Sequence, residues 1–142
     1  MIYLYKREKG RFMGAIKLEY HHIIEGKAVR KELELQEEML KIPYSKKSLF
    51  VSTVEGGSMQ PLIKDRSLVV ADLSQKEFAD KAVFLIEKDQ NMWIKQASEI
   101  EKEEFFVSIN SDFSNFVYKK DECRIIAKVL LHFDGQKYYL HQ

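Results

Sequence analysis

The stretch GGSMQPLIKDRSLVVAD, residues 56–72, joins a tightly defined turn to a short strand. Two glycines precede Ser58, and Pro61 follows it. Glycine permits backbone angles that other residues avoid, and proline fixes its own φ angle, so the turn around the serine is closely specified. The apolar run SLVVAD (67–72) then predicts a strand that ends at Asp72.

Further short strands are predicted on the C-terminal side of this stretch and just before it. Runs rich in β-branched and aromatic residues alternate with turn residues, at a spacing typical of β domains. They are LFVSTVE (49–55), KAVFLIEKD (81–89), MWIKQA (92–97), FFVSIN (105–110), CRIIAKVLLHF (123–133) and KYYLHQ (137–142). KDQN (88–91) and Asp134-Gly135 carry turn residues, which predict hairpins there. The fold class that follows is mostly β.

The first 47 residues allow two interpretations. In the first, a hairpin turns around Glu25-Gly26 and joins AIKLEYHHII (15–24) to AVRKELELQ (28–36). In the second, KAVRKELELQEEMLKI (27–42) is an amphipathic helix. We expect strands. The predicted division is an N-terminal arm or hairpin segment over 1–47 and a peptidase-like domain over 48–142.

Composition limits the class of protein. A length of 142 residues with 45% hydrophobic residues suits a globular domain with a real core, and a net charge of +1 gives no indication of nucleic-acid binding. No apolar run approaches the ~20 residues of a membrane helix, so we expect no membrane contact. The single cysteine, Cys123, excludes an internal disulfide and is interpreted as a packed thiol. These features predict a cytoplasmic protein.

Histidine is a poor candidate for activating Ser58. The four histidines are His21, His22, His132 and His141, and none stands in a recognisable catalytic motif. The nucleophile-elbow pattern requires a second glycine where this chain has Gln60. Adjacent strand residues point to opposite faces, so His21 and His22 do not form a metal pair. We predict no metal and no cofactor.

Lysine is the other possible base, provided that its amine is neutral near pH 7. Burial among apolar groups lowers a lysine pKa because it disfavours the charged form. Lys95 follows Ser58 by 37 residues and shares a strand face with Trp93, which would help to desolvate it.

Together these segments resemble the LexA-type Ser-Lys self-cleaving peptidases, a family that includes LexA, the UmuD mutagenesis proteins and many phage repressors. The resemblance rests on GGSMQP, on LIKDRSLVVAD, and on IKQA at the 37-residue separation. FVSINSDFSNF is similar to the Ser-Asn/Asp-rich strand end of the family, and CRIIAKVLLHF is similar to its closing strand. The similarity covers about residues 48–133.

The resemblance implies a LexA/signal-peptidase-like β-strand fold with a Ser-Lys dyad. Ser58 would be the nucleophile and Lys95 its general base. The backbone N–H groups of Gly57, Ser58 and Met59 would form the oxyanion hole, with the Met59 side chain packed inward as an anchor.

The sequence departs from the family pattern in two places. Asp65-Arg66-Ser67 stands where the family usually reads Asp-Gly-Asp. The family cleaves its own Ala-Gly or Cys-Gly bond about 35 residues before the serine, and this sequence contains neither dipeptide upstream of Ser58. Glu25-Gly26 is the glycine bond nearest the expected position.

Two hypotheses on function follow. The first is a self-cleaving peptidase domain of a phage-repressor or SOS-type transcriptional regulator: a homodimer, activated by a recombinase filament, which contacts DNA only through a separate domain. The alternative is a catalytically silent dimerisation or partner-binding domain with the same fold, which the missing Ala-Gly or Cys-Gly bond favours. A signal-peptidase-like enzyme is disfavoured because the sequence has no membrane-spanning segment.

Overall fold

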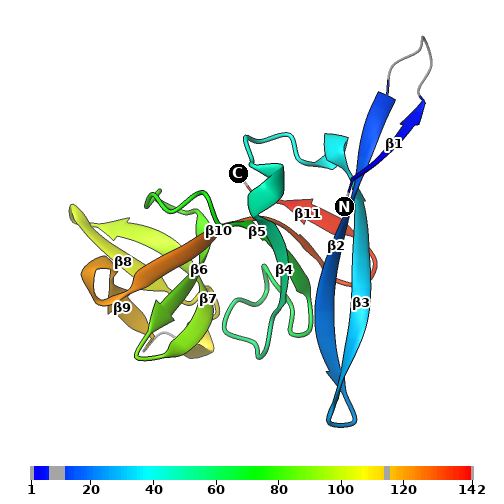
Figure 1. Cartoon of the computed structure of the whole chain (residues 1–142). Helices are drawn as coiled ribbons and strands as arrows, with labels where there is room; N and C mark the ends of the chain where they lie inside the picture. The colour runs from blue at the N-terminus through cyan, green and yellow to red at the C-terminus, as the bar shows by residue number, and fades with distance from the viewer. Residues whose placement is uncertain (1, 7–11, 114–115, 142) are drawn as a thin grey trace.

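The computed structural model describes residues 2–6, 12–113 and 116–141, and its strands form two antiparallel sheets (Figure 1). The smaller sheet has the order β1-β2-β3 and contains β1 (Ile2–Lys6), β2 (Phe12–Ile24) and β3 (Lys27–Gln36). The larger sheet has the order β4-β5-β10-β6-β7-β8-β9, with β11 paired to β10. Its strands are β4 (Leu49–Thr53), β5 (Leu68–Asp72), β6 (Val83–Lys88), β7 (Asn91–Ile100), β8 (Glu103–Val107), β9 (Val117–Lys119), β10 (Arg124–Phe133) and β11 (Tyr138–Leu140). The mostly β fold predicted from the sequence is confirmed.

Helical structure in the described residues is limited to short 3-10 turns. They are η2 (Glu37–Met39), η3 (Lys46–Ser48), η4 (Ser111–Phe113) and η5 (Lys120–Glu122). None of the described helices is long and apolar enough to cross a membrane.

Strand β10 links the two halves of the larger sheet. Its first half pairs with β6 and its second half with β5, and the register shifts between Ile125 and Ala127 and again between Val129 and Leu131. Such bulges bend a strand and increase its twist. Because β10 bends, it contributes Ala127 and Val129 to one buried cluster and Leu130 and Leu131 to another.

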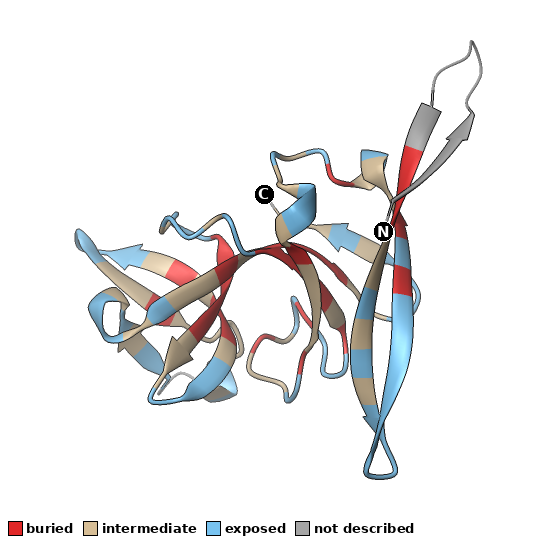
Figure 2. Ribbon diagram, in the orientation of Figure 1, coloured by how far each residue is buried: buried red, intermediate tan, exposed pale blue. Residues whose placement is uncertain are grey.

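The β2–β3 hairpin is anchored at only one end. Near its base, Ile16, Leu33 and Leu35 pack with buried residues of β4, β5 and β10. The first six residues of β3 are exposed, and Figure 2 shows the far half of the hairpin free of red, buried positions. The strand interpretation of 15–36 is therefore confirmed. The helix alternative for 27–42 is wrong, because pairing with β2 takes the place of helical periodicity.

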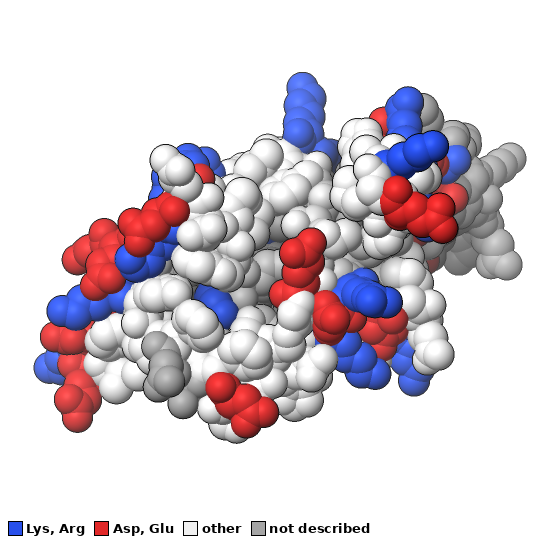
Figure 3. Space-filling model, turned by 90° about the horizontal axis from the view of Figure 1, so that it is seen from below, with Lys and Arg blue, Asp and Glu red and all other residues white. Residues whose placement is uncertain are grey.

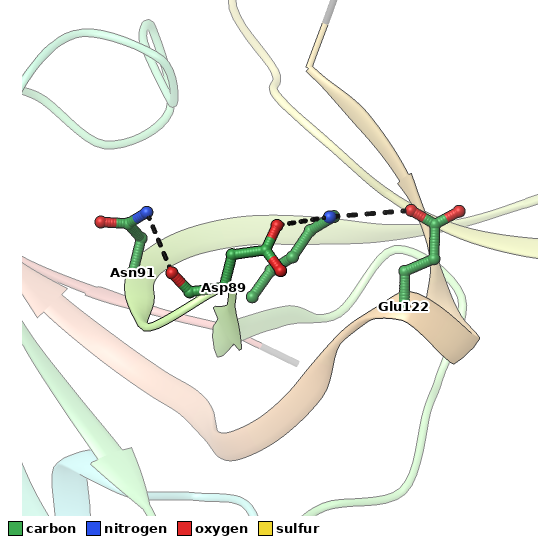
Figure 4. Close-up of polar contacts among 4 residues, drawn as sticks. Asp89, Asn91 and Glu122 are labelled. Atoms are coloured by element: carbon green, nitrogen blue, oxygen red, sulfur yellow. Dashed lines mark hydrogen bonds and ion pairs between the residues drawn. The ribbon is translucent and has the colours of Figure 1, made fainter.

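The hairpin that carries Lys95 turns through two residues in left-handed conformation. Asp89 and Gln90 have φ angles of 51° and 67°, as in the two-residue turns whose twist matches paired strands. At this turn the Lys88 ammonium bridges Asp89 (2.9 Å) and Glu122 (3.9 Å) (Figure 4). The sequence predicted this hairpin, and the Lys88 bridge ties it to the η5 segment before β10.

Asp72, the last residue of β5, is buried and connects the segments on either side of the β4–β5 pair. Its carboxylate accepts hydrogen bonds from the backbone N–H groups of Ser45 and Ser74, from the Ser74 hydroxyl and from the Gln75 amide. Burial alone would raise its pKa, but these hydrogen bonds outweigh burial and hold the pKa below its usual value. The carboxylate therefore joins the segment before β4 to the segment after β5.

The loop between β4 and β5 presents the serine and is closed at its neck. Val54 N–H donates to Ser67 O (2.9 Å) and Arg66 N–H donates to Val54 O (2.8 Å). Just before the neck, Ser67 N–H donates to Lys64 O, and Arg66 occupies the third position of that turn with φ 69°. A turn with positive φ at this position favours glycine, which is the residue the family usually has there.

Arg66→Gly should therefore stabilise the fold by about 1 kcal/mol, because glycine adopts positive φ without a steric penalty. Urea unfolding measures the change. Lys64→Gly, at an exposed residue of the same turn outside the positive-φ set, serves as the control and should lower the free energy of unfolding. If both substitutions lowered the free energy of unfolding equally, the backbone of Arg66 would not be strained.

Candidate active site

Ser58 and Lys95, which the sequence singled out, lie in hydrogen-bond contact. The Lys95 Nζ atom is 3.0 Å from Ser58 Oγ, although the two residues are 37 positions apart. The β4–β5 loop carries the serine and β7 carries the lysine. A nucleophile and a base within hydrogen-bond reach are the arrangement that serine activation requires.

Ser108 completes the surroundings of the amine. Gln96 of β7 lies opposite Val107 of β8, and one further step in that register sets Ser108 opposite Lys95. Lys95 Nζ donates to Ser108 Oγ over 2.8 Å. The two serine hydroxyls therefore flank the amine, and no carboxylate of the described residues is paired with it.

Burial makes Lys95 an unusual lysine. Only 2% of its surface is exposed, and desolvation lowers its pKa to about 8. Two hydroxyl partners compensate the charge less than a carboxylate would, so more of the amine is neutral near pH 7 than in an exposed lysine. The centroid of the Phe116 ring lies 5.3 Å from Nζ, whereas Trp93 stacks on Tyr118.

The turn around Ser58 is held from both sides. Met59 is 1% exposed and packs in the core cluster with Val54 and Ile63, so it has the anchoring position expected for it. Asp65 accepts a hydrogen bond from the Gly56 N–H at 2.8 Å. The Gln60–Pro61 peptide bond is cis.

Asn110 contacts the same turn from the segment after β8. Its backbone N–H donates to Ser58 O (2.9 Å), and its side-chain amide donates to Gly57 O (2.8 Å). The N–H groups of Gly57, Ser58 and Met59, which the family resemblance assigns to the oxyanion hole, have no acceptor in the described part of the chain.

A cleft opens beside the serine. It has a volume of about 240 Å³. Its walls are Ser52, Thr53, Val54, Glu55, Ser58, Met59, Leu85, Met92, Trp93 and Ile94. Figure 3 shows that charged side chains are most numerous at the two ends of the face seen from below, and that acidic groups also lie near its centre. The cleft therefore combines apolar side chains with hydroxyl groups and the Glu55 carboxylate, and it offers both kinds of contact to a bound peptide.

Comparison with protein families agrees with this geometry. The family described as Peptidase S24-like matches residues 12–130. The chain belongs to the Peptidase S24-like family. Its LexA-like peptidase fold, with a serine peptidase-type domain, is thereby established, and the family match includes the β2–β3 hairpin. The comparison with curated proteins gave no match.

The other candidate residues of this S24-like chain lie apart from the dyad. His132 and His141 contact each other through ring nitrogens 2.7 Å apart where β11 meets β10. Desolvation lowers the pKa of His132, and desolvation together with the neighbouring His132 lowers that of His141 to about 4. Cys123 is half-buried beside a core cluster, and burial raises its thiol pKa. Within the described ranges, no group of three or more metal-ligating side chains is assembled.

Sequence reasoning missed Ser108 and Asn110 as members of the site. Both lie in FVSINSDFSNF, a segment that was noted only for its resemblance to the strand end of the family. The register of β7 against β8 is the signal that would have found Ser108. No local pattern identifies Asn110, because its two partners are 52 and 53 residues earlier in the chain.

Burial of Lys95 should lower stability at neutral pH. The folded pKa of about 8 lies below the ordinary lysine value of 10.5, so the unfolded chain binds more protons between those pH values. Wild-type stability therefore rises with pH across that window. Lys95→Met removes the buried charge and should raise the free energy of unfolding at pH 7 by about 1–3 kcal/mol.

Denaturant unfolding between pH 7 and pH 10 checks this prediction. The advantage of Lys95→Met over wild type should shrink as the pH rises through 8 and beyond. Lys47→Met, at an exposed lysine, controls for the added apolar side chain and should show no such trend. An advantage that is constant over this pH range would contradict a depressed pKa for Lys95.

Proposed function

We propose that this chain is a self-cleaving serine peptidase domain in which Ser58 attacks a peptide carbonyl and neutral Lys95 takes the serine proton. The observation that carries the proposal is the 3.0 Å contact between Ser58 Oγ and a buried amine whose pKa is lowered to about 8. In the reactive state the Lys95 lone pair accepts the Ser58 O–H, while Ser108 holds the amine from the other side.

The chemistry runs through an acyl-enzyme. The Ser58 Oγ–carbon bond forms, and the developing oxyanion accepts hydrogen bonds from the N–H groups around Ser58. The Lys95 ammonium then gives its proton to the leaving amine as the peptide bond breaks. Water, deprotonated by Lys95, hydrolyses the ester and frees Ser58.

The β2–β3 turn is the best candidate for the bond that is cut. Glu25-Gly26 forms this turn, with φ angles of 50° and 77°. Residues 21–25 line a hollow of about 510 Å³ together with Thr53, Val54 and Glu55. The same three residues form one wall of the Ser58 cleft. The turn is therefore a neighbour of the cleft, and cleavage requires it to move past this wall.

The exposed half of the hairpin is suited to such a movement. Ile23 and Ile24 are 67% and 40% exposed, so no apolar burial holds the tip in its present position. These two residues also match the apolar part of the cleft lining, which Leu85, Trp93 and Ile94 contribute. Glu25 next to the scissile bond does not, and we expect this mismatch to make cleavage slow.

Self-cleavage should accelerate with pH. With a Lys95 pKa of about 8, the neutral amine increases from roughly one tenth at pH 7 to roughly nine tenths at pH 9. The first-order rate should therefore rise about tenfold over this interval. Incubation followed by mass spectrometry measures the rate and identifies the bond, which we expect to be Glu25–Gly26.

Ser58→Ala and Lys95→Ala should stay intact at every pH, while Lys47→Ala should cleave like wild type. An activated recombinase filament should increase the wild-type rate in the same assay. Fragments that form equally in Ser58→Ala, or wild-type chain that stays intact at pH 9 both with and without the filament, would overturn self-cleavage.

In this proposal the domain serves a phage-repressor or SOS-type transcriptional regulator in the cytoplasm, where it forms a homodimer and a separate domain contacts DNA. The second candidate is a catalytically silent dimerisation domain, which the lack of an upstream Ala-Gly or Cys-Gly bond favours. The three-residue edge strand β11 offers unpaired backbone for a second copy.

Sedimentation equilibrium of the Ser58→Ala chain tests dimer formation without interference from cleavage. We expect the average mass to rise from monomer toward dimer as concentration increases. A monomer at all concentrations would contradict both the homodimer and the silent dimerisation domain, whereas a dimer that never cleaves would favour the second candidate.

A further inference from the structure

Asn110 connects two elements, because each of its polar groups has a partner. Its backbone N–H donates to Ser58 O, and its backbone carbonyl accepts from Phe113 N–H (2.9 Å). Its side-chain oxygen accepts from Asp112 N–H (3.0 Å), and its side-chain NH₂ donates to Gly57 O (2.8 Å). The two oxygens of Asn110 thus accept hydrogen bonds from η4, and its N–H groups donate to the turn that carries Ser58.

The contact to Asp112 fixes which way the side-chain amide faces. The oxygen of an asparagine amide is distinguished from its nitrogen by the hydrogen-bond network. Because the Asp112 N–H requires an acceptor, the Asn110 oxygen lies on that side. The NH₂ group must then face Gly57 O, and asparagine is suited to this position because it combines a donor and an acceptor on one short side chain.

The two donated bonds determine where the nucleophile turn points its N–H groups. In a trans peptide the C=O and the following N–H point in opposite directions. The Gly57 and Ser58 carbonyls both face Asn110, so the N–H groups of Ser58 and Met59 face away from it. Ser58 and Met59 both line the cleft, and no described residue accepts from these two N–H groups.

We propose that Asn110 is a positioning residue for the oxyanion hole: its side-chain amide holds the Gly57–Ser58 peptide so that the Ser58 N–H stays available to the reacting oxygen. The inference rests on the proposed role of Ser58 as nucleophile. Asn110 does not touch the reacting atoms and acts through the Gly57 carbonyl. Loss of its NH₂ group frees that peptide to rotate and weakens the donor at the oxyanion.

Two substitutions separate this role from support of η4. Asn110→Asp keeps the backbone N–H and an acceptor for Asp112, but it replaces the NH₂ donor with an oxygen that repels Gly57 O. Asn110→Ala removes both side-chain contacts. Ser111→Ala, at the exposed neighbour, is the matched control.

The readout is phosphorylation of Ser58 by diisopropyl fluorophosphate, which does not depend on the bond that the chain cuts in itself. Ser58 Oγ bonds to phosphorus, the P–F bond breaks, fluoride leaves, and Lys95 takes the hydroxyl proton. The charge that develops on the phosphoryl oxygen requires the same N–H donors. Intact-protein mass spectrometry gives the labelling rate between pH 7 and pH 9, at a temperature below the melting onset of each variant.

We expect Asn110→Asp to be labelled at least about tenfold more slowly than wild type and no faster than Asn110→Ala. In Asn110→Ala, which adds no charge, the pH at half-maximal rate should stay that of wild type, because Lys95 keeps both hydroxyl partners. Ser111→Ala should react like wild type.

If Asn110→Asp were labelled at the wild-type rate while Asn110→Ala was labelled slowly, the role of Asn110 would be to support η4, and the proposal would be overturned. The proposal would also be overturned if both variants were labelled at the wild-type rate, or if the pH midpoint shifted in Asn110→Ala. Wild-type chain that is labelled but never cleaves would refute self-cleavage and leave the positioning role standing. If Ser58 were labelled no faster in wild type than in Lys95→Ala, both self-cleavage and the positioning role of Asn110 would be refuted.

Discussion

The structure of this site depends on one unfavourable burial, that of the Lys95 amine. A lysine that is 2% exposed and faces only hydroxyl groups loses hydration that no opposite charge replaces, and its pKa falls to about 8 for that reason. The rest of the larger sheet supports this arrangement. Strands β6 and β8 flank β7, Ser108 lies across from the lysine, and the β4–β5 loop closes over it with Ser58. Packing thus lowers the pKa of the amine, whereas a neighbouring carboxylate would raise it.

A buried amine is useful only if the nucleophile is held equally firmly. The β4–β5 loop is fixed at its neck by hydrogen bonds of Val54, from beneath by the buried Met59, and at its apex by Asn110. These contacts come from a strand end, a core cluster and a distant connection. The turn therefore combines glycine-rich backbone with a rigid surrounding, which is how a strained or reactive conformation is maintained in a folded protein.

The two sheets differ in how tightly they are held. The larger one surrounds the dyad with core clusters on both sides of β6 and β10, whereas the β2–β3 hairpin is packed only near its base. A well-packed half that holds Ser58 and Lys95 and a loosely packed projecting hairpin are the division expected if one part performs chemistry and another moves. The strained turn at Arg66 lines the hollow beside the hairpin, where the two parts meet.

The sequence by itself determined the β class, most strand positions and the β6–β7 hairpin, because alternation and turn residues encode them locally. The pairing of Ser58 with Lys95 was an expectation from the family resemblance, and the contact itself joins residues 37 positions apart. The sequence left the 27–42 segment open between strand and helix, since amphipathic periodicity there fits both, and β1 and β9 were not predicted because both are short and depend on pairing with a neighbouring strand. Only the tertiary structure decided that Ser108 flanks the amine and that Asn110 holds the nucleophile turn. Those contacts join residues 13 and 53 positions apart, and they exist only once the register of β7 and β8 and the closure of the β4–β5 loop are set.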